Sequence, residues 1–322
     1  MEIFYEAQPG IMKESAIALG FFDGVHPGHQ VVIGKAVEEA KKLGVKSGVV
    51  TFRDHPRALT RGTAPPLLTV IEQRVELFAA LGIDTTLALS FTEDLCRLSP
   101  REYVESILVN GMGARSISVG YNHHFGRDRE GDPELLRALG KEMGFVVHVA
   151  PMVFLGDIEV SSSRVREAVV AGDMETATKL LSRPYAILGT VVKGEGRGRK
   201  IGFPTANMGV SEVQLIPGRG VYAGLARIEG GAPLPAVINV GYRPTFTGDA
   251  QALLVEVHLL DFDQDIYGKR MHVDFLKFIR AEQKFDGIDA LRRQITADCG
   301  TAKEYVLSET RKSSAPDHPL PA

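Results

Sequence analysis

The stretch Gly20-Phe21-Phe22-Asp23-Gly24-Val25-His26-Pro27-Gly28-His29 lies between an apolar run at residues 15–22 and a helical pattern at residues 27–43. The run predicts a buried strand, and the recurrence of apolar residues every three or four positions predicts the helix that follows. Open α/β sheets bind ligands where a strand feeds a helix through such a turn, beside the unpaired N–H groups of the helix. The stretch therefore predicts both the fold of the first half and an anion site.

Strand and helix patterns continue to alternate up to residue 150. Such alternation favours right-handed crossovers and a mostly parallel, doubly wound α/β sheet. Ser99-Pro100-Arg101-Glu102 is a capping box with proline at its first helical position, so we expect a helix to begin there. We expect further strands at 47–52, 85–91, 115–120 and 145–150, and further helices at 71–81, 99–110 and 132–143.

The second half changes character from Tyr185 onward, where strand-like apolar segments are separated by Gly-rich turns. Many short strands without helices between them predict a small antiparallel barrel, and helical spacing returns only from Asp286. We expect one domain at 1–183, a second at 184–310, and a polar, Pro-rich disordered tail at 311–322. The expected barrel strands are 186–192, 220–228, 234–240, 252–260 and 271–279.

Composition excludes several classes of protein. The 322 residues carry 37 Lys and Arg against 40 Asp and Glu, a net charge of −3, which argues against a dedicated nucleic-acid binder. Two cysteines make no disulfide framework, and no apolar run approaches the roughly 20 residues of a membrane span. We therefore expect a cytoplasmic protein without nucleic-acid or membrane partners.

The first candidate site is the histidine-containing turn. His26 and His29 can both point into the crevice and donate hydrogen bonds to phosphate oxygens, while Gly24 and Gly28 allow close backbone approach. Two alternatives stay open: ordinary loop histidines, or a zinc pair, for which nothing nearby supplies the remaining ligands. The stretch Ser161-Ser162-Ser163-Arg164-Val165-Arg166 starts another helix, where hydroxyls and guanidinium groups could clamp a polyphosphate or simply cap the helix.

The second candidate site lies at residues 193–207, where four glycines and a local charge of +3 suggest a backbone nest for an anion. A flexible basic hairpin is the alternative. Thr205 and Asn207 place two neutral oxygens two residues apart, the kind of ligand that Mg²⁺ accepts together with water and phosphates. Glu256 shares a strand face with Leu254 and His258, and is either a solvated side chain or the base that phosphorylation of an alcohol requires.

A strand followed by G-F-F-D-G-V-H-x-G-H, V-T-F-x-x-H-P after the second strand, and a later S-S-S-R-V-R resemble the HxGH nucleotidyltransferases. The full form is similar to the FMN adenylyltransferase half of the bifunctional bacterial riboflavin kinase/FAD synthetase family. The resemblance implies a Rossmann-like domain in which FMN attacks the α-phosphorus of ATP, with His26 and His29 catalytic. His123 and His124 depart from the family pattern, which has an aromatic and an often basic residue there. By resemblance, the residues that bind ATP or phosphate are Gly24, Gly28, Asn122, Ser162, Ser163 and Arg166.

The segments G-R-x-x-G-F-P-T-A-N, 220–222, 237–246 and 256–262 resemble the riboflavin kinase domain of the same family, which is a six-stranded barrel. The resemblance implies that Thr205 and Asn207 hold Mg²⁺, that Glu256 is the base, and that Arg280 binds flavin. The substrates would be riboflavin, FMN and ATP, giving FMN and then FAD with pyrophosphate. Two rivals remain, a kinase without adenylylation and a flavin- or nucleotide-binding regulator without turnover. By resemblance, the kinase ATP-binding residues are Gly196, Gly198, Gly202 and Pro204.

Overall fold

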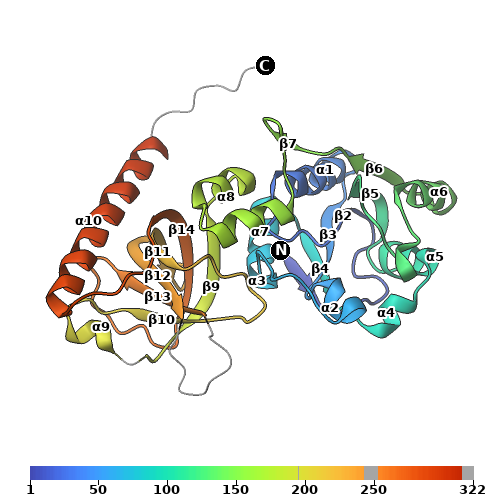
Figure 1. The fold of residues 1–322 in the computed structure, drawn as a ribbon. Coiled ribbons are helices and arrows are strands. Elements are labelled where there is room, and N and C mark those ends of the chain that lie inside the picture. The colour runs from blue at the N-terminus through green and yellow to red at the C-terminus, as the bar shows by residue number, and fades with distance from the viewer. Residues whose placement is uncertain (195, 243–252, 314–322) are drawn as a thin grey trace. The chain divides into compact units, whose positions relative to one another are not determined.

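The computed structural model describes residues 1–194, 196–242 and 253–313. The chain forms two compact units, Met1–Arg164 and Val165–Ala322 (Figure 1). The first is an α/β unit and the second is a barrel with helices, so the predicted fold classes are confirmed.

The first unit contains a six-stranded sheet in the order β1-β4-β3-β2-β5-β6, and every neighbouring pair is parallel. All residues of β2 and β4 are buried, as expected for parallel strands covered on both faces. The sequence patterns located every strand except β1. The strands are β1 Glu2–Phe4, β2 Ser15–Leu19, β3 Lys46–Phe52, β4 Thr85–Leu89, β5 Ala114–Gly120 and β6 Val146–Ala150.

Helices cover both faces of this sheet. Ala18 and Val49 pack against α1 and α3 on one face, while Ile17 and Ile117 pack against the segment after Ser99 and α6 on the other. The capping box at Ser99 is present, but it starts a four-residue α-helix that passes into a π-helix instead of one α-helix to residue 110. The helices are α1 Pro27–Leu43, α2 Pro56–Arg61, α3 Ile71–Ala80, α4 Glu93–Arg97, α5 Pro100–Tyr103, π-helix η1 Val104–Val109, 3₁₀-helix η2 Arg127–Arg129 and α6 Pro133–Met143; a hairpin of β7 Phe154–Leu155 and β8 Ile158–Glu159 follows β6.

The strand order creates a switch point between β2 and β5. From β2 the chain moves outward through β3 to β4, and then returns to the other side of β2 to form β5 and β6. The turns that follow β2 and β5 therefore leave the sheet in opposite directions, and open α/β sheets form their ligand-binding crevice at the carboxyl ends of two such strands. Both the histidine-containing turn and the 120–126 loop begin there.

The second unit is a closed antiparallel barrel in the order β10-β13-β12-β11-β14-β9. Its sixth strand, β10, is not among the strands that the sequence predicts, and its residues Ala206 and Asn207 belong to the candidate binding segment. Helix α10 Ile288–Ser313 packs across β11 and β12 through an apolar cluster that includes Ala302 and Val237. The strands are β9 Tyr185–Val192, β10 Ala206–Val210, β11 Gly220–Ile228, β12 Leu234–Tyr242, β13 Leu253–Leu259 and β14 Arg270–Arg280.

The second compact unit begins at Val165, ahead of the predicted domain boundary at 183/184. It includes α8 Met174–Leu181, which follows α7 Ser162–Ala171 and packs against β9 and β14. The predicted tail begins too early, since residues 311–313 are the last turn of α10. Residues 314–322, and residues 243–246 of one family segment, lie outside the described residues.

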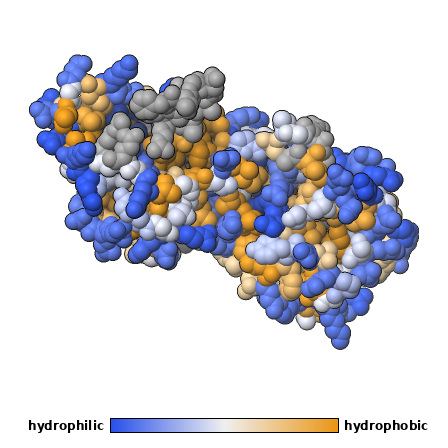
Figure 2. Space-filling view, turned by 90° about the horizontal axis from the view of Figure 1, so that it is seen from below, coloured by the Kyte–Doolittle hydropathy of each residue, from blue (hydrophilic) through white to orange (hydrophobic). Residues whose placement is uncertain are grey.

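Hydrophobic residues are interspersed with hydrophilic ones on the surface of both units, as Figure 2 shows for the face seen from below. The hairpin of β7 and β8 exposes Phe154, Leu155 and Ile158. Scattered exposed apolar residues are ordinary for folded domains and carry no functional argument. Within residues 1–194, 196–242 and 253–313, no helix combines the length and apolarity needed to cross a membrane.

Candidate active sites

The turn between β2 and α1 has an unusual backbone. Phe22 and Val25 adopt φ values of 55° and 43°, and Gly24 adopts 84°. Left-handed conformations are costly for bulky and β-branched residues, and they persist only where the surroundings hold them. The turn between β2 and α1 is therefore strained where a ligand site was predicted.

His26 and His29 lie together at the N-terminus of α1. His26 is the residue that precedes the helix, and its ring stacks on that of His29 with centroids 3.6 Å apart and planes 21° apart. A Cβ atom at Gly28 would lie 3.2 Å from the His26 ring, tighter than most real contacts. Gly28 was predicted to allow a ligand close to the backbone, and the structure gives it a second role, which is to leave room for His26. The two predicted histidines form one paired group at a helix N-terminus.

Asp23 is buried and braces this turn. Its carboxylate accepts hydrogen bonds from the backbone N–H groups of Leu68 (3.1 Å) and Thr69 (3.0 Å) and from the Thr69 hydroxyl (3.2 Å). The Gly24 N–H in turn donates to Thr69 Oγ1 at 2.9 Å. Sequence reasoning gave Thr69 no role, because it lies far from the motif in the chain and belongs to none of the matched segments.

The loop after β5 contributes the other side of the crevice. Asn122 is exposed there, as a ligand-binding residue needs to be, whereas His123 is partly buried and its ring lies parallel to that of Phe125 at 6.0 Å. Burial, together with the positive charges of His124 and Arg129, lowers the pKa of His123 to about 4. His123 is thus a neutral aromatic side chain at physiological pH, which reduces its departure from the aromatic residue of the family pattern.

The serine-rich start of α7 contacts the histidine turn. The Ser162 hydroxyl donates to the Asp23 carbonyl oxygen at 2.9 Å, while Ser163 is exposed. Arg166 lies one helical turn beyond Ser162 on the same side of α7, past the division between the units. Of the three predicted contacts, the structure brings Ser162 directly to the turn.

The predicted kinase residues form a row across the outer face of the barrel. In the strand register, Glu256 of β13 lies opposite Asn207 of β10 on one side and Asn239 of β12 on the other. Asn239 Nδ2 donates to Glu256 Oε2 at 3.4 Å. The flanking residues Val255 and Val257 are buried inside the barrel, so the row faces outward and is partly buried. Asn239 was part of a matched segment but had not been assigned a role.

The glycine segment closes over this row. A side chain at Gly194 would overlap the Asn207 amide, and one at Gly198 would overlap the Phe203 carbonyl and approach Thr205 Oγ1 to 3.2 Å. Residues Arg197–Lys200 form the short helix α9, so the segment is not the basic hairpin offered as the alternative. Gly196 and Gly202, with φ of 65° and 86°, are in the left-handed region at its two ends.

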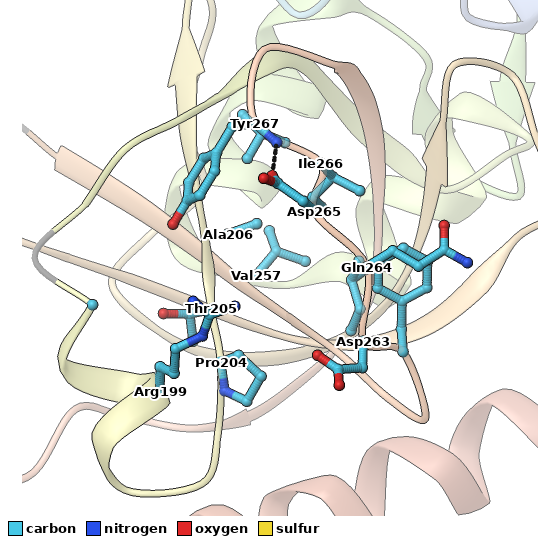
Figure 3. A pocket seen from close by; sticks show the side chains of 14 residues that line it. Arg199, Pro204, Thr205, Ala206, Val257, Asp263, Gln264, Asp265, Ile266 and Tyr267 are labelled. Atoms are coloured by element: carbon cyan, nitrogen blue, oxygen red, sulfur yellow. Dashed lines mark hydrogen bonds between the residues drawn. The ribbon is translucent and has the colours of Figure 1, made fainter.

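A cavity of about 170 Å³ lies between this segment and the 262–267 loop (Figure 3). Of the residues predicted to bind ATP or metal, Gly196, Pro204 and Thr205 line it. The opposite wall is formed by the loop after β13, where Asp265 accepts a hydrogen bond from the Tyr267 N–H at 3.0 Å. Gly198 and Gly202 are outside the lining, and sequence reasoning gave no role to the loop that completes the cavity.

His258 supports the same segment from β13. Its Nδ1 atom lies 2.7 Å from the Pro204 carbonyl oxygen, and its ring meets that of Phe203 edge-on at 5.6 Å. A tautomer with the proton on Nδ1 donates to that carbonyl. His258 lies two residues from Glu256 on the same strand face, so one strand positions both the candidate base and the segment predicted to bind a metal ion.

The guanidinium group of Arg280 is bound by other residues of the barrel unit. Its Nε and Nη2 atoms donate to the buried Asp298 carboxylate at 2.8–3.1 Å, and Nη1 donates to the Ala281 carbonyl at 3.0 Å. Gln294 also donates to Asp298, at 2.9 Å. All three guanidinium nitrogens are therefore engaged with protein atoms, and the Asp298 pairing links β14 to α10. The flavin contact of Arg280 stays a prediction.

Comparison with known proteins assigns both units to families. The FAD synthetase family matches residues 8–164 and the riboflavin kinase family matches residues 181–306. A bifunctional riboflavin kinase/FMN adenylyltransferase from Pseudomonas fluorescens is 42% identical over 88% of this chain and 91% of its own length. The Escherichia coli K12 protein of the same name is 38% identical over 90% and 92%. A solved structure named macrolide-efflux protein, from Streptococcus pneumoniae, has a TM-score of 0.83 and 29% identity over 94% of this chain and 99% of its own. The chain belongs to the bifunctional riboflavin kinase/FMN adenylyltransferase family.

Proposed function

We propose that the two reactions of the family are carried out by the two residue groups described above, one in each unit. The enzyme phosphorylates riboflavin with ATP to give FMN and ADP, and then joins FMN to ATP to give FAD and pyrophosphate. The observation that carries the residue assignment is the stacked pair of His26 and His29 at the N-terminus of α1, beside the switch point of the sheet.

In the adenylylation, a phosphate oxygen of FMN attacks the α-phosphorus of ATP and pyrophosphate leaves. The FMN phosphate is already ionised, so the step needs positioning and charge stabilisation instead of a base. His26 and His29 donate to the ATP phosphates, with Gly24 and the first N–H groups of α1 beside them. Asn122 lies on the loop at the other side of the crevice. Further phosphate contacts come from Gly28, Ser162, Ser163 and Arg166.

In the kinase reaction, the nucleophile is a neutral primary alcohol of riboflavin, which must lose a proton as it attacks the γ-phosphorus. Glu256 takes that proton, and Asn239 orients its carboxylate through the 3.4 Å hydrogen bond. ATP occupies the cavity between the glycine segment and the 262–267 loop, next to Pro204. Gly196, Gly198 and Gly202 allow the segment to turn its N–H groups toward phosphate.

Mg²⁺ fits the donors that this unit offers. In the described part of the chain, no three His, Cys, Asp or Glu side chains lie together as a metal site, so an all-protein cage for a metal is not formed there. Thr205 lines the cavity and Asn207 lies beside Glu256, which gives two neutral oxygen ligands and leaves room for water and phosphates. Mg²⁺ held there would neutralise charge on the transferred phosphoryl group.

The test is to incubate the protein with riboflavin, ATP and Mg²⁺ and to separate the flavins. FMN together with FAD is the expected result. FMN alone would leave a kinase whose first unit has lost adenylylation, and no conversion would leave a flavin- or nucleotide-binding regulator. Omitting Mg²⁺ and adding a chelator should stop FMN formation, which tests the metal separately. We place the reactions in the cytoplasm. Cys96 and Cys299 are free thiols, and the cytoplasm keeps thiols reduced.

A further inference from the structure

Arg74, in the first turns of α3, is completely buried, with 0% of its surface exposed. Arginine is almost never fully buried unless its charge and donors are satisfied by the protein. We infer that Arg74 is a positioning residue for adenylylation, because it holds in place the two backbone segments that form the site. The inference rests on the proposed role of His26 and His29.

The guanidinium group of Arg74 joins two strand ends. Its Nη1 atom donates to the carbonyl oxygen of Phe21, at 2.8 Å, and to that of Phe52, at 2.9 Å. Its Nη2 atom donates to the carbonyl oxygen of Arg53 at 3.0 Å. Phe21 belongs to the turn after β2, whereas Phe52 and Arg53 end β3 and begin the next segment. One side chain thus connects the two stretches that sequence analysis identified separately.

The geometry requires an arginine. The acceptors diverge, and a planar fork with several fixed N–H groups can reach all three, whereas an ammonium group is a single point. The guanidinium carbon also lies 4.6 Å above the centre of the Phe21 ring, so the ring and the carbonyl of one residue are held by one group. Burial lowers the pKa of Arg74 to about 10, so the group stays charged at neutral pH.

The same segment holds the histidine turn at a second point. Leu68 and Thr69, which precede α3, donate to the Asp23 carboxylate, and the Gly24 N–H donates to Thr69. The strained residue Phe22 lies between the part held by Arg74 and the part held by Thr69. Residues 68–74 therefore hold the backbone on both sides of Phe22, and such support is what maintains a bulky residue in a left-handed conformation.

The consequence for the reaction follows from the short distance along the chain. His26 lies five residues after Phe21, with the strained turn between them, so a shift of Phe21 is transmitted to the stacked histidine pair. Misplacing a reacting group by about 1 Å can lower a rate by roughly 10²-fold. Arg74 acts through the backbone of the turn and not by touching substrate.

The experiment compares Arg74→Met, Arg74→Lys and the control Arg115→Met in the full chain. Arg115 belongs to the same unit, but its guanidinium pairs with Glu14 at the surface. We expect kcat for FMN adenylylation to fall about 10²-fold in Arg74→Met and less in Arg74→Lys. The KM values for FMN and ATP should change little, because donors are displaced and not removed. Riboflavin phosphorylation in the same samples, and both activities of Arg115→Met, should equal those of the wild type.

Each outcome decides the question. If Arg74→Met is folded, as judged by circular dichroism, and keeps wild-type kcat for adenylylation, the inference is wrong. It is also wrong if both activities fall in proportion, because that reports loss of folded protein. If Arg74→Met does not fold, the kcat and KM of FMN adenylylation by Arg74→Lys are compared with those of the wild type in the same way, and an unchanged kcat contradicts the inference. Adenylylation by the wild-type chain is measured first. A wild-type chain that makes FMN but no FAD would overturn the proposed adenylylation itself.

Discussion

Replacing Glu256 with glutamine should separate the two reactions within one chain. Glutamine keeps the size of the side chain and a carbonyl oxygen that can accept from Asn239, but it cannot take a proton from an alcohol. General-base help is typically worth about 10²–10⁴-fold, so FMN formation should fall by that factor. The same factor corresponds to about 2.7–5.4 kcal/mol of activation free energy, at about 1.36 kcal/mol for each tenfold.

The cost to folding should be much smaller. The hydrogen bond between Asn239 and Glu256 is long, at 3.4 Å, and its net contribution is about 0.5–1.5 kcal/mol even in a good geometry. Glutamine retains most of this bond. The kinetic effect therefore exceeds the stability effect, and a folded, ATP-binding and catalytically slow kinase is the expected product.

The assay uses two starting flavins. With riboflavin, the Glu256→Gln variant should produce little FMN or FAD; with FMN, it should produce FAD at the wild-type rate. Glu212→Gln, at an exposed turn after β10 in the same unit, is the matched control and should behave as wild type with both. Phosphorylation of riboflavin at near wild-type rate would refute the role of Glu256 and leave it a solvated strand residue. Absence of rescue by FMN in a folded variant would show that the two sites depend on each other.

Two further predictions concern the first unit. Gly28→Ala places a Cβ 3.2 Å from the His26 ring, a contact so tight that the ring must shift, so adenylylation should fall about 10²-fold while riboflavin phosphorylation is unchanged. A wild-type rate of adenylylation would mean that the histidine pair adapts to the added methyl group. The pKa of His123 is about 4 in the folded chain, against an ordinary value of 6.5. Between pH 6.5 and pH 4 the unfolded chain therefore binds a proton at His123 that the folded chain does not, so the free energy of unfolding falls as the pH drops through this range. His123→Phe should lessen this fall in thermal unfolding scans between pH 8 and pH 4.5, and an unchanged pH dependence would contradict it.

The fold could be predicted where burial imposes a period on the sequence. The fully buried strands β2 and β4 appear as short apolar runs preceded by Ser15 or by Thr85 and Thr86, and the helices between strands show regular apolar spacing. Strand β10 was not predicted, because its residues Ala206-Asn207-Met208-Gly209-Val210 include several with low strand propensity. Only its pairing with β9 and β13 makes it a strand. The outward-facing Asn207 then aligns with Glu256, a relation between distant residues that no local pattern contains.

Candidate site residues could be predicted from the sequence where they lie close together along the chain. His26 and His29 are three residues apart and share one turn, so the motif contains their geometry. Arg74 lies 53 residues after Phe21 and binds backbone carbonyl groups, which leave no trace in residue identity. For Arg280, the resemblance implies a flavin contact, and the structure adds a pairing with Asp298 of α10 that no local pattern predicts. A motif specifies which residues are present, and long-range packing decides which of them are free to meet a ligand.

The boundary between the units yields the last prediction. Helix α8 packs against β9 and β14, and its side chains Met174, Leu180 and Leu181 are at most 2% exposed. Burying such a side chain is worth about 1.5–3 kcal/mol, so a fragment that starts at residue 184 loses several kcal/mol of stability. A fragment of residues 165–322 keeps this packing.

Both fragments retain Thr205, Asn207 and Glu256, so both should phosphorylate riboflavin and neither should adenylylate FMN. The 165–322 fragment should match the kcat of the full chain, whereas the 184–322 fragment should unfold at a temperature lower by about 5 °C or more. Activity and thermal unfolding measured side by side distinguish the two boundaries. Equal unfolding temperatures would mean that α8 adds nothing to the barrel and that the division at 183/184 is the physical one. An inactive but folded 165–322 fragment would mean instead that the kinase reaction needs the first unit, which neither the strand register around Glu256 nor the cavity beside Thr205 requires.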